Sequence, residues 1–172
     1  VVIAENLRAE DKYVPTIIGT GFAESKGLHH GYIINSSEVA KSVRLAVNQA
    51  EKTSGIKVTR AFISMGGIGL MGITTTASVV VSRAEQEITQ LDIHKALEAC
   101  EEEIPKALYL NRKIINTLPI QFKIDNKQVW GKPLGLKGTK LEVKTLIITC
   151  LEHHLHDLVE ALETSGIEGI DV

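Results

Sequence analysis

Apolar and polar side chains alternate along IQFKID, the segment from Ile120 to Asp125. Successive side chains of a strand point to opposite faces of a sheet, so this period of two predicts a strand with one buried face. A second strand is predicted from Leu141 to Cys150, where the sequence becomes apolar on both faces toward its end. That composition favours a more central position in the sheet.

Helices are predicted on either side of these strands, where apolar residues recur every three or four positions. The predicted helices run over Asn35–Lys52, Thr89–Ile104 and Leu155–Leu162, with stops at Gly55, Pro105 and Gly166. Asn35 is followed by Glu38 at the spacing of a capping box, which marks the start of the first helix. Each helix carries one apolar stripe and is therefore expected to pack one side against a sheet.

Short runs rich in β-branched residues predict the remaining strands. They are Val1–Ala4 paired with Thr16–Ala23, then Tyr32–Ile34, Val58–Met65, Met71–Val81 and Ile167–Val172. The segment from Tyr32 to Val81 thus reads as a strand-helix-strand-strand unit, with a turn from Gly66 to Gly72 joining its last two strands. The chain is predicted to have an α/β fold, and both of its ends read as sheet elements cut short.

Composition excludes several classes of function. The 172 residues carry a formal charge of -2, which supplies no broad attraction for a phosphate backbone, so nucleic acid is not an expected partner. Apolar runs stay far below the ~20 residues needed to cross a bilayer. Cys100 and Cys150 lie in apolar segments, which favours buried reduced thiols and a cytoplasmic protein.

The run Gly67-Ile68-Gly69-Leu70-Met71-Gly72 has the spacing of a dinucleotide-binding fingerprint. That chemistry needs a helix to begin at the third glycine, and strand composition follows instead, so a hairpin turn is favoured. No nucleophile motif and no phosphate loop ending in Lys is visible. The chain is therefore not predicted to be a self-sufficient enzyme, and no cofactor site is predicted within it.

Histidines supply the one metal hypothesis. His153 and His156 are three residues apart and could share a helix face, with Asp157 beside them. A small metal-dependent enzyme built on this pair is thus an alternative function. We favour a solvated helix start for His153, His154 and His156, because adjacent residues of a helix point in different directions.

Two polar regions are candidate partner surfaces. Trp130 stands in the loop Asn126–Gly138 beside Lys132 and Lys137, a composition found at interface anchors if the ring is exposed. A folded-back position of Trp130 in the core is the favoured alternative. Glu101 and Glu102 belong to an acidic cluster near a helix end, which reads either as a solvated face or as a docking patch for a basic partner.

Several segments together resemble the bacterial actin-like cell-division proteins of the FtsA type. The resemblance rests on the stretches Ile17–Gly21, Lys26–Gly31, Val43–Glu51 and Val81–Asp92, and most specifically on Leu118–Asp125, Pro133–Gly138 and Ile147–Cys150 in this order. It implies an actin-like ATPase fold in which an inserted strand-helix-strand-strand subdomain replaces one actin subdomain. By this resemblance residues 1–31 begin the actin-like subdomain, 32–149 form the insertion and 150–172 return to the actin-like subdomain.

The resemblance also implies a function in protein–protein contact. In such a protein the inserted subdomain touches the neighbouring protomer in filaments and serves the recruitment of division proteins, while the full protein anchors the tubulin-like FtsZ at the inner face of the cell membrane. ATP and Mg²⁺ are expected for the full-length protein, and membrane contact only through a segment outside this sequence. A pilus-assembly actin homologue of the PilM type, which binds a peptide of a membrane partner, is the runner-up.

Overall fold

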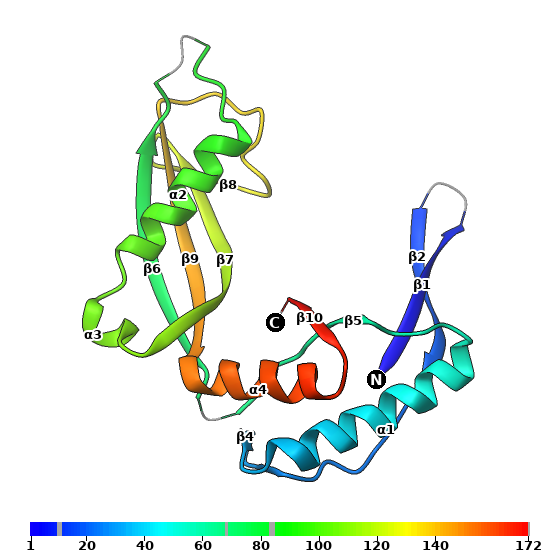
Figure 1. Cartoon of the computed structure of the whole chain (residues 1–172). Coiled ribbons are helices and arrows are strands. Elements are labelled where there is room, and N and C mark those ends of the chain that lie inside the picture. Colours follow the sequence, from blue (N-terminus) through cyan, green and yellow to red (C-terminus); the bar gives the residue numbers. More distant parts are fainter. Residues whose placement is uncertain (10–11, 68, 83–84, 172) are drawn as a thin grey trace. The chain divides into compact units, whose positions relative to one another are not determined.

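The computed structural model describes residues 1–9, 12–67, 69–82 and 85–171 (Figure 1). The chain forms two compact units. Unit 1 comprises Val1–Ile68 and His153–Val172, and unit 2 comprises Gly69–Glu152. Within the described residues, no helix has both the length and the apolar character that crossing a membrane requires.

Unit 2 is built on a four-stranded antiparallel sheet with the strand order β6-β9-β7-β8. The strands are β6 (Met71–Val80), β7 (Arg112–Ile124), β8 (Lys127–Val129) and β9 (Lys140–Leu151). The central position predicted for the Leu141–Cys150 strand is confirmed, because β9 pairs with β6 on one side and β7 on the other.

Helix α2 (Gln90–Glu102) covers one face of this sheet and contacts β6 and β9, while the short α3 (Lys106–Tyr109) leads into β7 (Figure 1). Thr89 caps α2 as predicted: the Asp92 carboxylate accepts hydrogen bonds from the Thr89 amide at 2.9 Å and from its hydroxyl at 2.7 Å. The buried core between α2 and the sheet contains Val81, Ile88, Ile93, Ala96, Cys100, Ile104, Ile124, Leu141, Val143 and Ile147.

The period of two decides which face of β9 is buried. Leu141, Val143 and Ile147 are fully buried, and Thr145 between them is fully buried as well. The Thr145 hydroxyl lies 3.1 Å from the Thr75 hydroxyl of β6, so both polar groups have a partner inside the core. Glu142 lies on the opposite face of the sheet, where water reaches it.

Unit 1 begins with the antiparallel hairpin of β1 (Val2–Ala9) and β2 (Lys12–Thr20), on which α1 (Ser36–Ser54) packs. Both predicted ends of α1 are confirmed. Asn35 accepts a hydrogen bond from the Glu38 amide at 3.2 Å, and Gly55 adopts φ of 73° as the C-cap. Gly19 of β2 lets the hairpin approach α1 closely, because a Cβ there would stand 2.7 Å from the Ala50 carbonyl oxygen.

The rest of unit 1 consists of short strands and helix α4. They are β3 (Leu28–His29), β4 (Tyr32–Ile33), β5 (Arg60–Phe62), α4 (Glu152–Thr164) and β10 (Glu168–Asp171). β3 pairs with β4 in a small antiparallel ladder, and β5 pairs with β10 in parallel.

The strand-helix-strand-strand unit lies elsewhere in the chain than predicted. The segment from Tyr32 to Val81 does not form one, because β4 pairs with β3, β5 with β10 and β6 with β9. The order strand, helix, strand, strand is instead realised in unit 2 by β6, α2, β7 and β9. Local propensity predicts the helices and strands. Which strands pair with one another is decided by packing between segments that are distant in the sequence.

Two further boundaries differ from the prediction. The compact unit around the long sheet begins at Gly69 rather than at Tyr32, because α1 packs on β2 in unit 1. The hairpin predicted across Gly66–Gly72 is wrong, since β5 and β6 belong to different sheets. Ile68, within that turn, lies outside the described residues.

Candidate functional site

Trp130 follows β8 at the surface of unit 2, and 88% of it is exposed. The core position favoured from the sequence is therefore wrong. Leu134 and Leu136 in the same loop are also exposed, as are Lys132 and Lys137. We call this segment (residues 127–138) the Trp130 loop. It presents a large aromatic ring and two leucines to solvent among basic side chains.

Backbone hydrogen bonds hold the Trp130 loop against the segment that precedes α2. Ile88 donates to the Leu136 carbonyl at 2.9 Å and accepts from the Gly135 amide at 2.9 Å, while Gly138 donates to Gln86 at 2.9 Å. Pro133, within the loop, is fully buried. The exposed side chains thus stand on a fixed backbone, which lowers the entropic cost of binding a partner.

Asp125 anchors both ends of the same loop. Asp125 and Asn126 have φ of 48° and 66°, the left-handed conformation that a tight hairpin between β7 and β8 requires. The Asp125 carboxylate accepts hydrogen bonds from the Thr139 hydroxyl at 2.6 Å and from the Lys140 amide at 3.0 Å. The Thr139 hydrogen bond is the main cause that lowers the pKa of Asp125 below its ordinary value.

The predicted acidic residues lie at the other end of α2. Glu101 accepts a hydrogen bond from the Thr117 hydroxyl at 2.6 Å, which ties the end of the helix to β7. Glu101 and Glu102 line a cavity of about 520 Å³ with Lys106 and Tyr109. Because α2 is about 20 Å long, this region and the Trp130 loop are separate surfaces.

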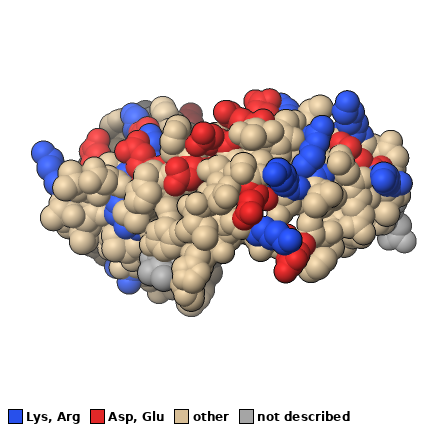
Figure 2. Space-filling model, turned by 60° about the horizontal axis from the view of Figure 1, so that its bottom comes forward, with Lys and Arg blue, Asp and Glu red and all other residues tan. Residues whose placement is uncertain are grey.

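One face of the molecule carries charges of both signs. Figure 2 shows lysine, arginine, aspartate and glutamate side chains interspersed over one face of the molecule. This mixture fits the formal charge of -2. Such a mixture of charges does not attract a polyanion over a long range.

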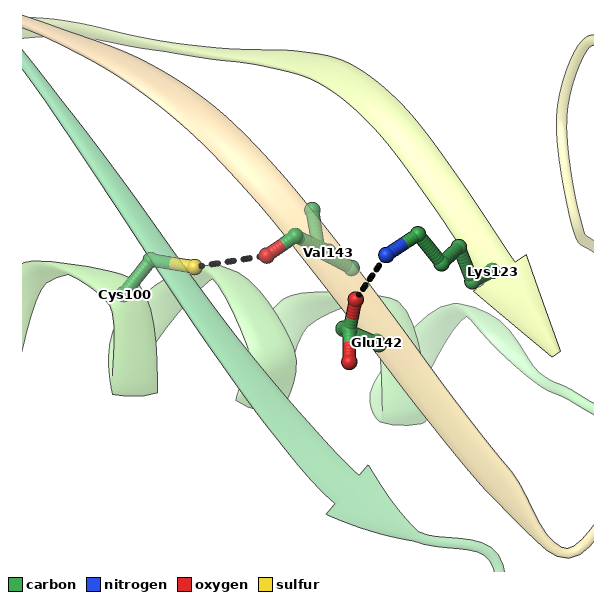
Figure 3. Close-up of polar contacts among 4 residues, drawn as sticks. All are labelled: Cys100, Lys123, Glu142 and Val143. Atoms are coloured by element: carbon green, nitrogen blue, oxygen red, sulfur yellow. Dashed lines mark hydrogen bonds and ion pairs between the residues drawn. The ribbon is translucent and has the colours of Figure 1, made fainter. Parts of the chain in front are cut away.

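The two cysteines take part in packing. Both are free and buried, as the sequence predicts. Figure 3 shows the Cys100 Sγ of α2 directed at the Val143 carbonyl of β9, which accepts its hydrogen bond at 3.4 Å. Burial raises the pKa of the Cys150 thiol, which disfavours the thiolate needed for metal binding or redox chemistry.

The solvated helix start predicted for the three histidines is confirmed only in part. The described residues contain no group of three or more His, Cys, Asp or Glu side chains placed to hold a metal ion. His153 and His156 are exposed at the start of α4, but His154 is only 6% exposed, so the solvated position predicted for it is wrong. The ring of Tyr32 covers it edge-on, with centroids 3.8 Å apart.

His154 is a candidate site residue that the sequence alone did not identify. Its Nε2 atom is buried and has no hydrogen-bond partner among the described residues. Burial is the main cause that lowers the pKa of His154, followed by the charge of His153. No local pattern marks this position, because the packing partner Tyr32 lies far away along the chain.

Comparison with known families matches residues 72–149 to the SHS2 domain inserted in FTSA. This segment lies within unit 2 and contains the order β6, α2, β7, β9 described above. Unit 2 is therefore an SHS2 domain of the FtsA type. Over most of its length the chain is also similar to cell division protein FtsA of several bacteria.

Curated relatives cover more of the chain than this domain. The chain is 31% identical over 157 residues to cell division protein FtsA of Bacillus subtilis, matching 91% of the chain and 35% of that protein. It is 27% identical over 168 residues to FtsA of Streptococcus pneumoniae, matching 98% of the chain and 35% of that protein. The chain thus spans about a third of the length of these relatives.

A solved structure shows the same fold at low sequence identity. The PilM-PilN type IV pilus biogenesis complex contains a chain with a TM-score of 0.58 and 11% identity, covering 99% of this chain and 42% of that chain. This likeness confirms the predicted class, a fragment of an actin-like fold that carries an inserted domain. It is a likeness of fold alone.

Proposed function

We propose that this chain is the assembly module of an FtsA-type cell-division protein and acts through protein–protein contact rather than catalysis. The observation that carries the proposal is the match of residues 72–149 to the SHS2 domain inserted in FTSA. A second feature supports it: the Trp130 loop presents exposed apolar side chains on a backbone fixed by hydrogen bonds. Rigid aromatic anchors of this kind dominate the energetics of many interfaces.

The partners we propose are other division proteins, FtsZ through the full-length protein, and further copies of the same protein in filaments. The Trp130 loop, with Lys132 and Lys137, is the proposed primary surface. Glu101 and Glu102 form a proposed second surface for a basic partner. One carboxylate oxygen of Glu101 already accepts a hydrogen bond from the Thr117 hydroxyl.

ATP and Mg²⁺ enter this proposal only through the full-length protein, at the cytoplasmic face of the cell membrane. We expect calorimetric titration of this chain with Mg-ATP to show no micromolar binding, because the run from Gly67 to Gly72 is not followed by the helix that a phosphate site needs. A micromolar dissociation constant would place the nucleotide site within this chain and contradict the proposal.

The proposal is tested by binding. Purified FtsZ, other division proteins and the chain itself are the immobilised partners, and wild-type chain, Trp130→Ala and Phe22→Ala are compared in solution. Phe22 is a matched control because it is also 88% exposed but lies in unit 1. We expect Trp130→Ala to weaken binding by on the order of 2 kcal/mol and Phe22→Ala to leave it unchanged. Equal binding by all three proteins at equal thermal stability would contradict the proposal that the Trp130 loop binds these partners.

A PilM-like role in pilus assembly is the second candidate, favoured by the likeness of fold. It differs in the partner, which would be a short peptide of a membrane protein. Binding of such a peptide, without binding to any division protein, would favour this candidate.

A further inference from the structure

The sheet of unit 2 has two edges, and they differ in how they are protected. β8 forms one edge with only three residues, one of which is Lys127. β6 forms the other edge with ten residues, none of them charged or proline, and its register with β9 contains no bulge. Shortness, charge, proline and bulges are the devices that keep edge strands from pairing with other chains. The β8 edge has two of these devices, and the β6 edge has none.

The backbone of β6 points alternately toward β9 and toward the open edge. The amide of Val81, directly after β6, donates to the Thr139 carbonyl, directly before β9, at 2.8 Å. The N–H and C=O groups of one residue in an antiparallel strand lie on the same side, and neighbouring residues alternate, so the odd-numbered residues bond to β9. The even-numbered residues present these groups at the edge; they are Gly72, Thr74, Thr76, Ser78 and Val80.

No second strand covers this edge among the described residues. β9 is the one strand that pairs with β6 in that part of the chain, and Figure 1 shows β6 at the outer margin of the sheet. The edge thus offers a row of backbone donors and acceptors, and the group that matches such a row is another extended backbone.

The core side of β6 is also incompletely covered. On the central strand β9, Leu141, Val143 and Ile147 are fully buried. The apolar side chains of β6 that pack against the same core are only partly buried, although α2 packs on this strand too; they are Ile73, Ala77 and Val79. A strand added beside β6 would cover them, provided that it carries apolar side chains on the side of α2.

The open side of β6 sets a second requirement. Thr74, Thr76 and Ser78 are exposed there and carry no charge. Hydroxyl-bearing side chains stabilise antiparallel strands when they lie opposite one another. The edge therefore fits an extended segment with apolar residues on one side and threonine-like residues on the other, without charge or proline in the paired stretch.

We propose that the open edge of β6 binds such an extended segment of another protein, which joins the sheet as an additional strand. In this mode of recognition, main-chain hydrogen bonds supply affinity and alternate side chains supply specificity. The inference goes beyond the proposed function, because it concerns a different surface: Trp130 follows β8, at the opposite edge of the sheet.

A second copy of this chain fits the edge less well than a free segment. Two β6 strands paired about a two-fold axis would bring two α2 helices together, because α2 packs on both β6 and β9. With strands about 4.8 Å apart, the helix axes would lie within about 10 Å, the distance of direct helix packing. The side of α2 turned away from Glu101 and β7 carries the exposed Lys95 and Glu102. Burying these charges costs about as much as their pairing returns, and an extended segment brings no helix.

The first experiment measures amide hydrogen exchange along β6 in the free chain by NMR. The even-numbered amides should exchange fast and the odd-numbered amides slowly, because only the latter bond to β9. Slow exchange at all positions in dilute protein would mean that the edge is already covered, which overturns the proposal. Protection of the even-numbered amides that grows with protein concentration would assign the edge to a second copy and overturn the proposed occupant.

The second experiment adds a model peptide of about ten residues in which Val and Thr alternate, with a Lys beyond each end for solubility. Binding should slow the exchange of the even-numbered amides at least about tenfold. Two N-methylated versions of the peptide are matched controls. Residues that lie opposite each other share a face and a bonding state, so the Thr residues of the peptide bond to the even-numbered residues of β6. N-methylation of the Thr residues should abolish binding, and N-methylation of the Val residues should leave it.

The third experiment changes the protein. Thr76→Pro removes an amide that points to the edge, a place where a strand tolerates proline, and should weaken peptide binding at least about tenfold. Thr76→Val is the matched control, since it keeps the amide and should bind like wild type. Circular dichroism checks that Thr76→Pro is folded; the methylated peptides decide the question if it is not, because they leave the protein unchanged.

The outcomes separate this inference from the proposed function. No binding of the unmethylated peptide, equal binding of both methylated peptides, or wild-type affinity of folded Thr76→Pro overturns the edge as a binding site. Each of these results leaves the Trp130 loop and its proposed partners untouched. Conversely, Trp130→Ala should bind the peptide like wild type, and a loss of peptide binding in folded Trp130→Ala would place the peptide at the Trp130 loop and overturn the inference.

Discussion

Unit 2 and unit 1 satisfy their buried groups to different degrees. In unit 2 one continuous core joins α2 to the sheet, and the buried hydroxyls of Thr75 and Thr145 pair with each other. In unit 1 the sheets have two strands each, Phe22 and Phe62 are exposed, and the His154 Nε2 atom has no partner among the described residues. Unit 2 is thus organised around one interior, whereas unit 1 leaves a buried polar atom unpaired among the described residues.

The largest expected effect tests how much the core beneath α2 stabilises the protein. Leu141→Ala removes a fully buried side chain from the centre of the core and should cost about 2–5 kcal/mol of unfolding free energy. Leu45→Ala in α1 is the control in unit 1, since Leu45 is exposed, and should change stability by no more than about 0.5 kcal/mol. Urea unfolding followed by circular dichroism measures both. Equal losses would mean that Leu141 contributes no more to stability than an exposed leucine does.

A smaller effect sharpens the same comparison at a polar pair. Thr145→Val leaves the Thr75 hydroxyl buried without its partner and should cost about 1–3 kcal/mol. The double variant Thr75→Val and Thr145→Val removes both hydroxyls and should recover part of that loss. Thr76→Val is the control, because Thr76 is exposed on the opposite face of β6. If the double variant loses more unfolding free energy than the two single variants lose together, the pair is not coupled as described.

The sequence predicted those features of the fold that are encoded locally. The ends of α1 follow from Asn35 and Gly55, the cap of α2 from Thr89, and the central place of β9 from its apolar run. The parallel pairing of β5 with β10 and the antiparallel pairing of β6 with β9 were missed. Both join segments far apart in the chain, and no short-range pattern specifies such partners.

The candidate sites were predicted less well than the fold. The exposure of Trp130 depends on how its loop is bonded to Ile88, and loop conformation is not written in periodicity. The burial of His154 depends on Tyr32, which reaches it through the β3–β4 ladder. In both cases the sequence suggested the opposite burial, because the deciding contact is tertiary.

The next prediction uses pH to separate the units. The pKa of His154 is lowered from the ordinary value of 6.5, mainly by burial, so the folded state prefers the neutral ring. The unfolded chain then binds more protons, and unit 1 should lose stability as pH falls below about 6.5. Amide hydrogen exchange of α1 and α4 should report this loss, while exchange of β9 changes less.

His154→Gln provides the control for that measurement, since it removes the titrating ring and keeps a polar group. The variant should flatten the pH dependence of exchange in α4 between pH 7 and 5. An unchanged pH dependence would assign it to other groups, of which His153 and Asp157 are the nearest charged neighbours of His154.

The smallest expected effect concerns the ion pair on the open face of unit 2. Lys123 Nζ lies 2.8 Å from Glu142 Oε1, and this hydrogen bond is the main cause that lowers the pKa of Glu142 (Figure 3). A lowered carboxyl pKa adds stability above the ordinary value of 4.5, and this stability is lost as pH falls through the lowered pKa. Because the side chains are 38% and 23% exposed, screening by water limits the pair to about 0.2–1 kcal/mol. A double-mutant cycle with Lys123→Met and Glu142→Gln at pH 7 measures the coupling, which should shrink in 1 M salt. A coupling above about 2 kcal/mol, insensitive to salt, would mean that this face is covered, and the contrast with the dry core beneath α2 would then fail.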